Sequence, residues 1–192
     1  MIKKLGGKAL VAGLAASLFL AACATGKVKV NTTAPRSAME KYQTVAITVL
    51  NDVGPVCPDN VAPCIQSAAI RQLKVKFPSV FSEVRTEPAG AANELFVEIH
   101  ITKYKKGSRL ARAMLIGLGS SKIATTLVFI DSTSKSTITT GRLGLTWALG
   151  GIIGATKGIE DLVESAGAKI ANAIVEQRVG KAVPKAAALG GS

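Results

Sequence analysis

The stretch Leu95-Phe96-Val97-Glu98-Ile99-His100-Ile101-Thr102-Lys103-Tyr104 alternates between apolar and polar side chains along its length. Successive side chains of a strand point to opposite faces of a sheet, so this period of two predicts a half-buried strand. One side of it carries Leu95, Val97, Ile99 and Ile101. The other side carries Phe96, Glu98, His100, Thr102 and Tyr104. The stretch therefore predicts a sheet with one face turned towards an apolar core.

Flanking segments supply partners for this strand. Runs rich in β-branched residues predict four more strands, at residues 44–50, 80–85, 121–131 and 136–147. The last two are joined by the polar turn Asp131-Ser132-Thr133-Ser134-Lys135, which predicts a hairpin.

Helical periodicity predicts two helices, at residues 64–77 and 159–179. In the second helix, Glu160, Asp161 and Glu164 lie in the first turns and Arg178 lies near the end, an arrangement that complements the helix dipole. These elements predict an α+β fold. We expect a single mixed β-sheet of about five strands with the two helices packed on one face.

The N-terminal segment predicts export. Lys3, Lys4 and Lys8 precede an uncharged apolar run at residues 9–20, which is typical of a secretory signal peptide. The run is shorter than the about 20 residues that a membrane-spanning helix needs. Its ending, Leu20-Ala21-Ala22-Cys23, resembles the lipobox of bacterial lipoproteins, which implies cleavage before Cys23 and a lipid on that residue. The alternative is an ordinary cleaved signal with a cysteine nearby.

This segment divides the chain into four parts. We expect a lipoprotein signal peptide at residues 1–22, a lipid-anchored flexible tether at 23–40, a periplasmic domain at 41–180 and a disordered tail at 181–192. The residue after Cys23 is Ala24 rather than Asp. That resembles lipoproteins passed on to the outer membrane, so we expect a lipid anchor there with the domain facing the periplasm.

The chain is strongly basic, with 24 lysines and arginines against 12 acidic residues and a formal net charge of +12. An exported basic protein meets anionic lipid headgroups, lipopolysaccharide phosphates and the cell wall, and we expect no nucleic acid partner outside the cytoplasm. The basic residues are scattered along the sequence, which favours a solvated surface over a dedicated patch.

Cys57 and Cys64 have six residues between them. In an oxidising compartment this pair predicts a disulfide that closes a short loop. The alternative is a redox or metal site, but the spacing is not C-x-x-C, and His100, the only histidine, has no metal-ligand spacing to the pair. We therefore expect neither a metal nor a cofactor.

Catalytic motifs are weak in this chain. The stretch Gly117-Leu118-Gly119-Ser120-Ser121 lacks the Gly-Lys-Ser/Thr ending of a phosphate loop. A hydrolytic site would have to combine His100 with Glu98 and one of these serines, whereas a strand histidine is more simply a surface or packing residue. We expect no enzyme and identify no small-molecule substrate. Residues 143–156 are uncharged and contain Trp147; they could touch a membrane or a partner, and we favour burial.

The segment that runs from Gly107-Ser108-Arg109 to Gly117-Leu118-Gly119-Ser120-Ser121 resembles a family of bacterial lipoproteins known as domain of unknown function 4410. The resemblance extends over residues 42–179, with one departure at Ser134, where a glycine is usual in the family. The order of elements is also similar to periplasmic domains of the curli-secretion-channel lipoprotein and related envelope lipoproteins.

The resemblance implies a periplasmic α/β domain for binding or assembly and transfers no catalytic residue. Arg109 and Arg112 match the family motif, and could bind an acidic group of a partner bidentately or pin their loop to Glu98. We expect the partner to be an envelope protein or another copy of the chain. The alternatives are a subunit of an outer-membrane secretion or channel assembly and, less favoured, a hydrolytic enzyme.

Overall fold

The computed structural model describes residues 26–31, 34–108, 110–111, 119–147 and 158–180. The strands are β1 (Val28–Val30), β2 (Thr44–Asn51), β3 (Glu83–Arg85), β4 (Glu94–Lys105), β5 (Ser121–Asp131) and β6 (Thr137–Trp147). The α-helices are α2 (Arg36–Glu40), α3 (Val61–Lys76) and α6 (Ile159–Val179), and a 3-10 turn, η2, spans Gly54–Val56.

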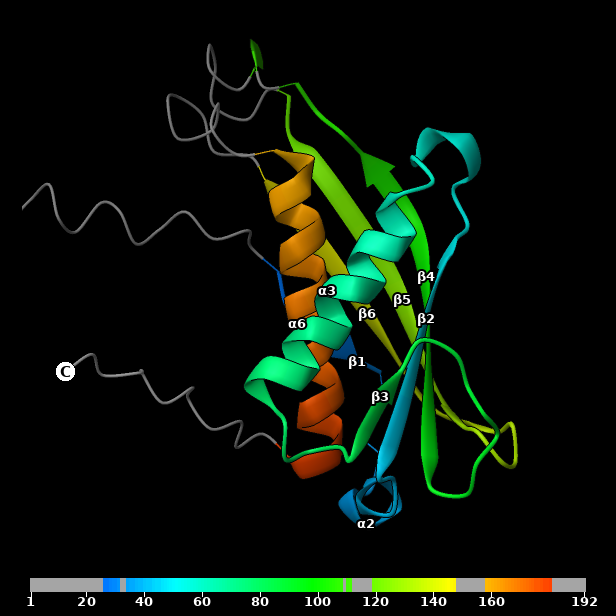
Figure 1. Ribbon diagram of the computed structural model, residues 1–192. Helices are drawn as coiled ribbons and strands as arrows, with labels where there is room; N and C mark the ends of the chain where they lie inside the picture. The colour runs from blue at the N-terminus through cyan, green and yellow to red at the C-terminus, as the bar shows by residue number, and fades with distance from the viewer. Residues whose placement is uncertain (1–25, 32–33, 109, 112–118, 148–157, 181–192) are drawn as a thin grey trace, which may run out of the picture.

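The six strands of the described residues form one mixed sheet in the order β1-β6-β5-β4-β2-β3. Strands β4, β5, β6 and β1 pair in antiparallel fashion, whereas β2 pairs in parallel with both β4 and β3. The parallel pairing of β2 and β4 is made possible by α3, which crosses over between β2 and the following strands (Figure 1). The predicted α+β class is confirmed, with six strands where about five were expected.

Helices α3 and α6 lie on the same face of the sheet (Figure 1). The alternate residues of β4 that were predicted to face the core are fully buried beneath them: Leu95, Val97, Ile99 and Ile101. The other face of the sheet, which we call the open face, carries Thr, Lys and Arg side chains with intermediate or full exposure in β4, β5 and β6.

The two helices approach closely because small residues meet at their crossing. A Cβ atom placed on Gly167 of α6 would lie 2.5 Å from the Cβ of Ala68 in α3 and 2.8 Å from the nitrogen of Ala69. A glycine at this crossing therefore lets both helices press their apolar sides onto the sheet together.

The segment expected to be a flexible tether is partly ordered. Strand β1 pairs with β6, and α2 packs on α6 with Met39 wholly buried. The carbonyl oxygen of Tyr42 accepts a hydrogen bond from Arg178 Nε at 2.7 Å, which ties the end of this segment to α6. The prediction of a tether over 23–40 is wrong for residues 28–30 and 36–40, and β1 is the strand missing from the expected count.

Three boundaries also differ from expectation. Helix α3 begins at Val61 rather than Cys64, because Val61 and Ala62 are buried and extend its apolar side. Strand β3 is shorter than the predicted 80–85. A register shift in β4 between Ile101 and Lys103 turns Tyr104 to the buried side, which strict alternation did not predict.

Candidate binding site

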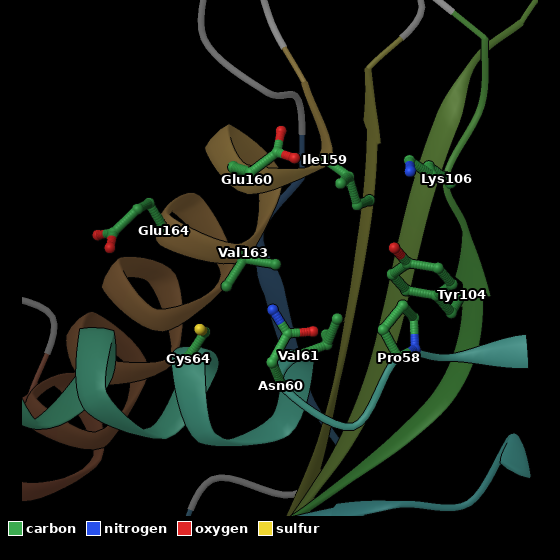
Figure 2. A pocket seen from close by; sticks show the side chains of 10 residues that line it. All are labelled: Pro58, Asn60, Val61, Cys64, Tyr104, Lys106, Ile159, Glu160, Val163 and Glu164. Atoms are coloured by element: carbon green, nitrogen blue, oxygen red, sulfur yellow. The ribbon is translucent and has the colours of Figure 1, made fainter. Parts of the chain in front are cut away.

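A cavity of about 300 Å³ lies where the N-terminal ends of α3 and α6 meet the end of β4 (Figure 2). Its lining is mostly apolar, with charged groups contributed by one lysine and two glutamates. The residues around it are Pro58, Asn60, Val61, Cys64, Tyr104, Lys106, Ile159, Glu160, Val163 and Glu164. Ligand sites in proteins are typically concave and apolar with a few polar groups, so this cavity is the candidate binding site.

Local structure positions each wall of the cavity. Helix α3 enters through a turn in which Val61 N donates to Pro58 O at 3.0 Å. Helix α6 begins with a capping interaction in which Gly158 N donates to Asp161 Oδ2 at 2.7 Å, so Asp161 caps the helix in addition to placing a negative charge in its first turn, where the sequence predicted one. The bulge in β4 points Tyr104 towards the helices and completes the site.

Charge in the site is arranged around its rim. Glu164 accepts hydrogen bonds from Arg71 Nη2 at 2.6 and 2.5 Å, and both side chains are more than half exposed, so this ion pair links α6 to α3 without contributing much to stability. Tyr104 is buried, and burial, together with the nearby Cys57 and Glu160, raises its pKa. The phenol is therefore neutral, and the site offers an apolar interior with a charged edge.

The family motif forms the base of the β4–β5 connection beside this cavity. Ser108 N donates to Gly119 O at 2.9 Å, and Ser121 Oγ donates to the carbonyl of Lys106, whose side chain lines the site. Gly107 has φ +72°, and a Cβ there would lie 2.4 Å from Gly119 O. The glycine at position 107 is thus explained by the close approach of the two ends of the connection.

Several predicted site residues fall outside the described residues. These are Cys23, predicted to carry the lipid, and Arg109 and Arg112, predicted to bind a partner. The described positions next to the two arginines are Ser108, Leu110 and Ala111, and Leu110 is 72% exposed. Of residues 143–156, only 143–147 are described, and there Leu143, Leu145 and Trp147 are buried, in line with the burial that we favoured.

The predicted disulfide is not formed in the structure. Cys57 and Cys64 are both free; Cys57 is buried, whereas Cys64 is exposed in the first turn of α3 and lines the cavity. The two thiols occupy different environments because the chain between them turns into the helix at Val61, earlier than predicted. Burial, with a smaller contribution from the charge of Asp59, raises the pKa of the Cys57 thiol.

The side chains that a hydrolytic site would need lie apart. His100 is on the open face, where its Nδ1 and Nε2 atoms lie 2.8 Å from Asp52 Oδ2 and 2.7 Å from Glu98 Oε1. Ser121 is fully buried on the opposite face of the sheet, at the start of β5, whereas His100 pairs with Thr126 in the middle of that strand. The structure therefore brings His100 and Glu98 together but separates both from Ser121.

Two further clusters were missed by sequence reasoning. Asp131 Oδ2 accepts hydrogen bonds from Lys41 Nζ and Tyr42 Oη, both at 2.7 Å. The wholly buried carboxylate of Glu94 accepts from Ala89 N, Gly90 N and Ser132 Oγ. Both clusters join segments far apart in the sequence, and no local pattern marks such pairs. They lie at the start of β4 and the end of β5, away from the cavity, and serve the fold.

Within the described part of the chain, no group of three or more histidine, cysteine or acidic side chains is placed to hold a metal ion. No described helix has both the length and the apolar character needed to cross a membrane.

Solved structures with the same fold include PelC from Paraburkholderia phytofirmans, a dodecamer, at 16% identity and a TM-score of 0.54, covering 79% of this chain and 97% of that one. A methionine-for-leucine variant of that dodecamer gives the same score and coverage at 15% identity. A Caulobacter crescentus protein described as a candidate lipoprotein gives 14% identity and a TM-score of 0.40, covering 76% and 96%. At these identities the likeness to PelC shows a shared fold.

Sequence comparison assigns the central part of the chain. No curated protein matches the sequence. The resemblance to the curli-secretion-channel lipoprotein stays a prediction. Residues 58–151, from the turn before α3 to beyond the end of β6, match the family described as a domain of unknown function, and this confirms the resemblance noted in the sequence: the chain carries a DUF4410 domain.

Proposed function

We propose that this chain is a lipid-anchored protein of the bacterial envelope whose domain acts by binding and assembly rather than by catalytic turnover. The lipobox-like ending at Cys23 supports the anchor. The observation that carries the proposal is the fold shared with PelC, which was solved as a dodecamer and matches over 97% of its length. Because the likeness to this dodecamer extends over the whole fold and not over one motif alone, it supports self-association best among the functions considered.

The finer location follows from the sequence. The residue after Cys23 is Ala24, which supports transfer to the outer membrane, with the domain facing the periplasm. Arg109 and Arg112 belong to the β4–β5 connection whose base adjoins the cavity at Lys106. In this proposal they bind an acidic group of the partner while the cavity takes one of its apolar side chains.

A subunit of an outer-membrane secretion or channel assembly is the second candidate. The observation that favours it is again the dodecamer, since a closed assembly of many copies can surround a passage. A hydrolytic enzyme is the weakest candidate, because His100 and Ser121 lie on opposite faces of the sheet.

Assembly is tested by extracting the full chain from membranes in mild detergent and measuring the mass of the particle that it forms by light scattering. We expect a particle containing many copies. A strictly monomeric protein over the whole accessible concentration range would contradict the proposal.

The role of the cavity is tested with a photo-crosslinking amino acid placed at Lys106, on the cavity wall. The matched control places it at Lys76, in the last turn of α3, at the other end of that helix. We expect a crosslinked product with a second copy or an envelope protein from position 106 only. Equal products from both positions, or none from either, would argue against the cavity as the binding site.

A further inference from the structure

The open face of the sheet gathers basic residues that are scattered in the sequence. Lys29 of β1, Lys103 and Lys105 of β4, Lys122 of β5 and Arg142 of β6 all lie on it, and all are exposed except Lys122, which is half-buried. Pairing across the strands fixes their side: Lys105 is opposite Lys122, and Lys29 is opposite Arg142. We call these five residues the basic face.

The basic face is compact. The five residues lie on four adjacent strands. Basic residues that neighbour each other are on the same or adjacent strands and are offset by at most four residues along the strand direction, so their charges are about 5–14 Å apart. Small residues fill the positions between them: Ala124, Thr126, Gly144 and Thr146. No bulky side chain therefore stands between the basic residues, and their long side chains can extend from the sheet towards a partner.

The carboxylates of this face are already engaged. Glu98 and Asp52 both bind His100, towards the β2 side of the sheet. Glu160 and Glu164 belong to α6, on the opposite face. Among the described residues, none of these five lysines and arginines forms an ion pair with Glu98 or Asp52, so the field above this part of the open face is positive.

The path of the chain brings this face close to the predicted anchor. Gly26 lies beside β6, since a Cβ placed there would lie 2.2 Å from Gly144 O. Gly144 lies on the open face, on β6 between Arg142 and the residue that pairs with Lys122. Cys23 is only three residues before Gly26, and three residues span at most about 10 Å. A lipid on Cys23 would thus hold this edge of the sheet within about 10 Å of the headgroups, near the Debye length of physiological salt.

We propose that the basic face docks on the phosphate-bearing headgroups of the membrane in which Cys23 is anchored, and so fixes the orientation of the domain. This rests on the proposed lipid anchor for its geometry. Phosphate oxygens accept charge-assisted hydrogen bonds from lysine and arginine side chains, and a membrane surface rich in anionic headgroups attracts a cluster of such residues. The cavity between α3 and α6, on the other side of the sheet, then remains accessible to a partner.

The test separates the face from the anchor by using the full mature chain with Cys23→Ser, which carries no lipid. Its binding to phosphatidylcholine vesicles, with and without phosphatidylglycerol, is measured by co-sedimentation at low and at high salt. The test variant adds Lys103→Gln, Lys105→Gln and Lys122→Gln. The matched control adds Lys74→Gln, Lys76→Gln and Lys169→Gln, which remove the same charge from α3 and α6.

Each basic residue near an anionic surface contributes about fivefold to membrane partitioning, so the test variant should bind phosphatidylglycerol vesicles about 100-fold more weakly, whereas the control should change about threefold or less. Binding should also require phosphatidylglycerol and weaken at high salt. Equal losses in the two variants, or equal binding to neutral vesicles, would overturn the proposal. So would a test variant that binds vesicles normally but no longer self-associates, because the face would then be a protein interface. Failure of lipidation at Cys23 leaves this result unaffected, which separates the two proposals.

Discussion

Gly167 of α6 and Ala68 of α3 meet so closely that a Cβ atom on the glycine would lie 2.5 Å from the alanine Cβ. This contact sets the separation of the two helices whose N-terminal ends enclose the candidate binding site. Because backbone atoms of Ala69 lie on the same side at 2.8 Å, a side chain at position 167 cannot be accommodated by a rotamer change alone.

Gly167→Ala should therefore force the helices apart and destabilise the fold by about 1–3 kcal/mol, measured by urea denaturation. The control is Gly144→Ala, since nothing lies within 4 Å of a Cβ at Gly144. That change should be neutral or slightly stabilising. Equal stability of the two variants would contradict the close packing of α3 on α6.

Asp131 anchors the segment after α2 to the end of β5. Its carboxylate accepts hydrogen bonds from Lys41, from the backbone of Ser134 and from Tyr42, and these hold its pKa well below the ordinary value. A carboxyl group whose pKa is lower in the folded than in the unfolded state stabilises the fold at pH values above its unfolded pKa of about 3.9. This stabilisation is lost as the pH falls from there through the folded-state pKa.

Asp131→Asn should cost about 2 kcal/mol at neutral pH, and the difference from the unmodified chain should shrink progressively below about pH 4. Urea denaturation over a pH series measures both quantities. Asp59→Asn, at an exposed position before α3, is the control. A cost at position 131 that stays constant into acid would show that the carboxylate charge is not the stabilising feature.

His100 is held between two carboxylates. Burial lowers its pKa, but the hydrogen bonds to Glu98 and Asp52 outweigh burial and raise the pKa above the ordinary value. An imidazole whose pKa is higher in the folded than in the unfolded state stabilises the fold. The stabilisation is fully present below the unfolded pKa of about 6.5 and is lost as the pH rises through the folded-state pKa.

His100→Gln should therefore be destabilising at about pH 5 and close to neutral at about pH 9. Because His100 is the only histidine, its imidazole resonance can be titrated by NMR without assignment in an untagged protein. The expected midpoint is above about 6.5. A midpoint at or below that value would disprove the bridged arrangement.

Cys57 and Cys64 differ in burial, so they should differ in reactivity. A maleimide added to the native protein should modify the exposed Cys64 rapidly and the buried Cys57 only on unfolding. Mass analysis after digestion separates the two sites. If neither thiol reacts in the exported protein until a reductant is added, the two cysteines form the disulfide that the sequence predicts, and the expected difference in reactivity is wrong.

Much of the fold could be predicted because local patterns were strong. The bounds of β5 and α6 agree with the sequence prediction, since alternation and helical period run through each element without interruption. Strand β1 and helix α2 were missed because three and five residues are too short to show a period. They are held by tertiary contacts of Val28 and Met39 instead.

The sites were harder to predict than the elements. The inward turn of Tyr104 depends on a bulge that alternation does not reveal. The basic face depends on strand register, which places Lys29 beside Arg142 although 112 residues lie between them. The scattered charges of the sequence therefore form a patch only once the strands have paired.

A lipid on Cys23 would be detected by incorporation of labelled palmitate during expression of the chain in a Gram-negative host. We predict a labelled protein that fractionates with the outer membrane, and an unlabelled Cys23→Ser variant that does not. An unmodified chain that carries no label, or a Cys23→Ser variant that is labelled and fractionates identically, would show that a lipid on Cys23 does not anchor the protein.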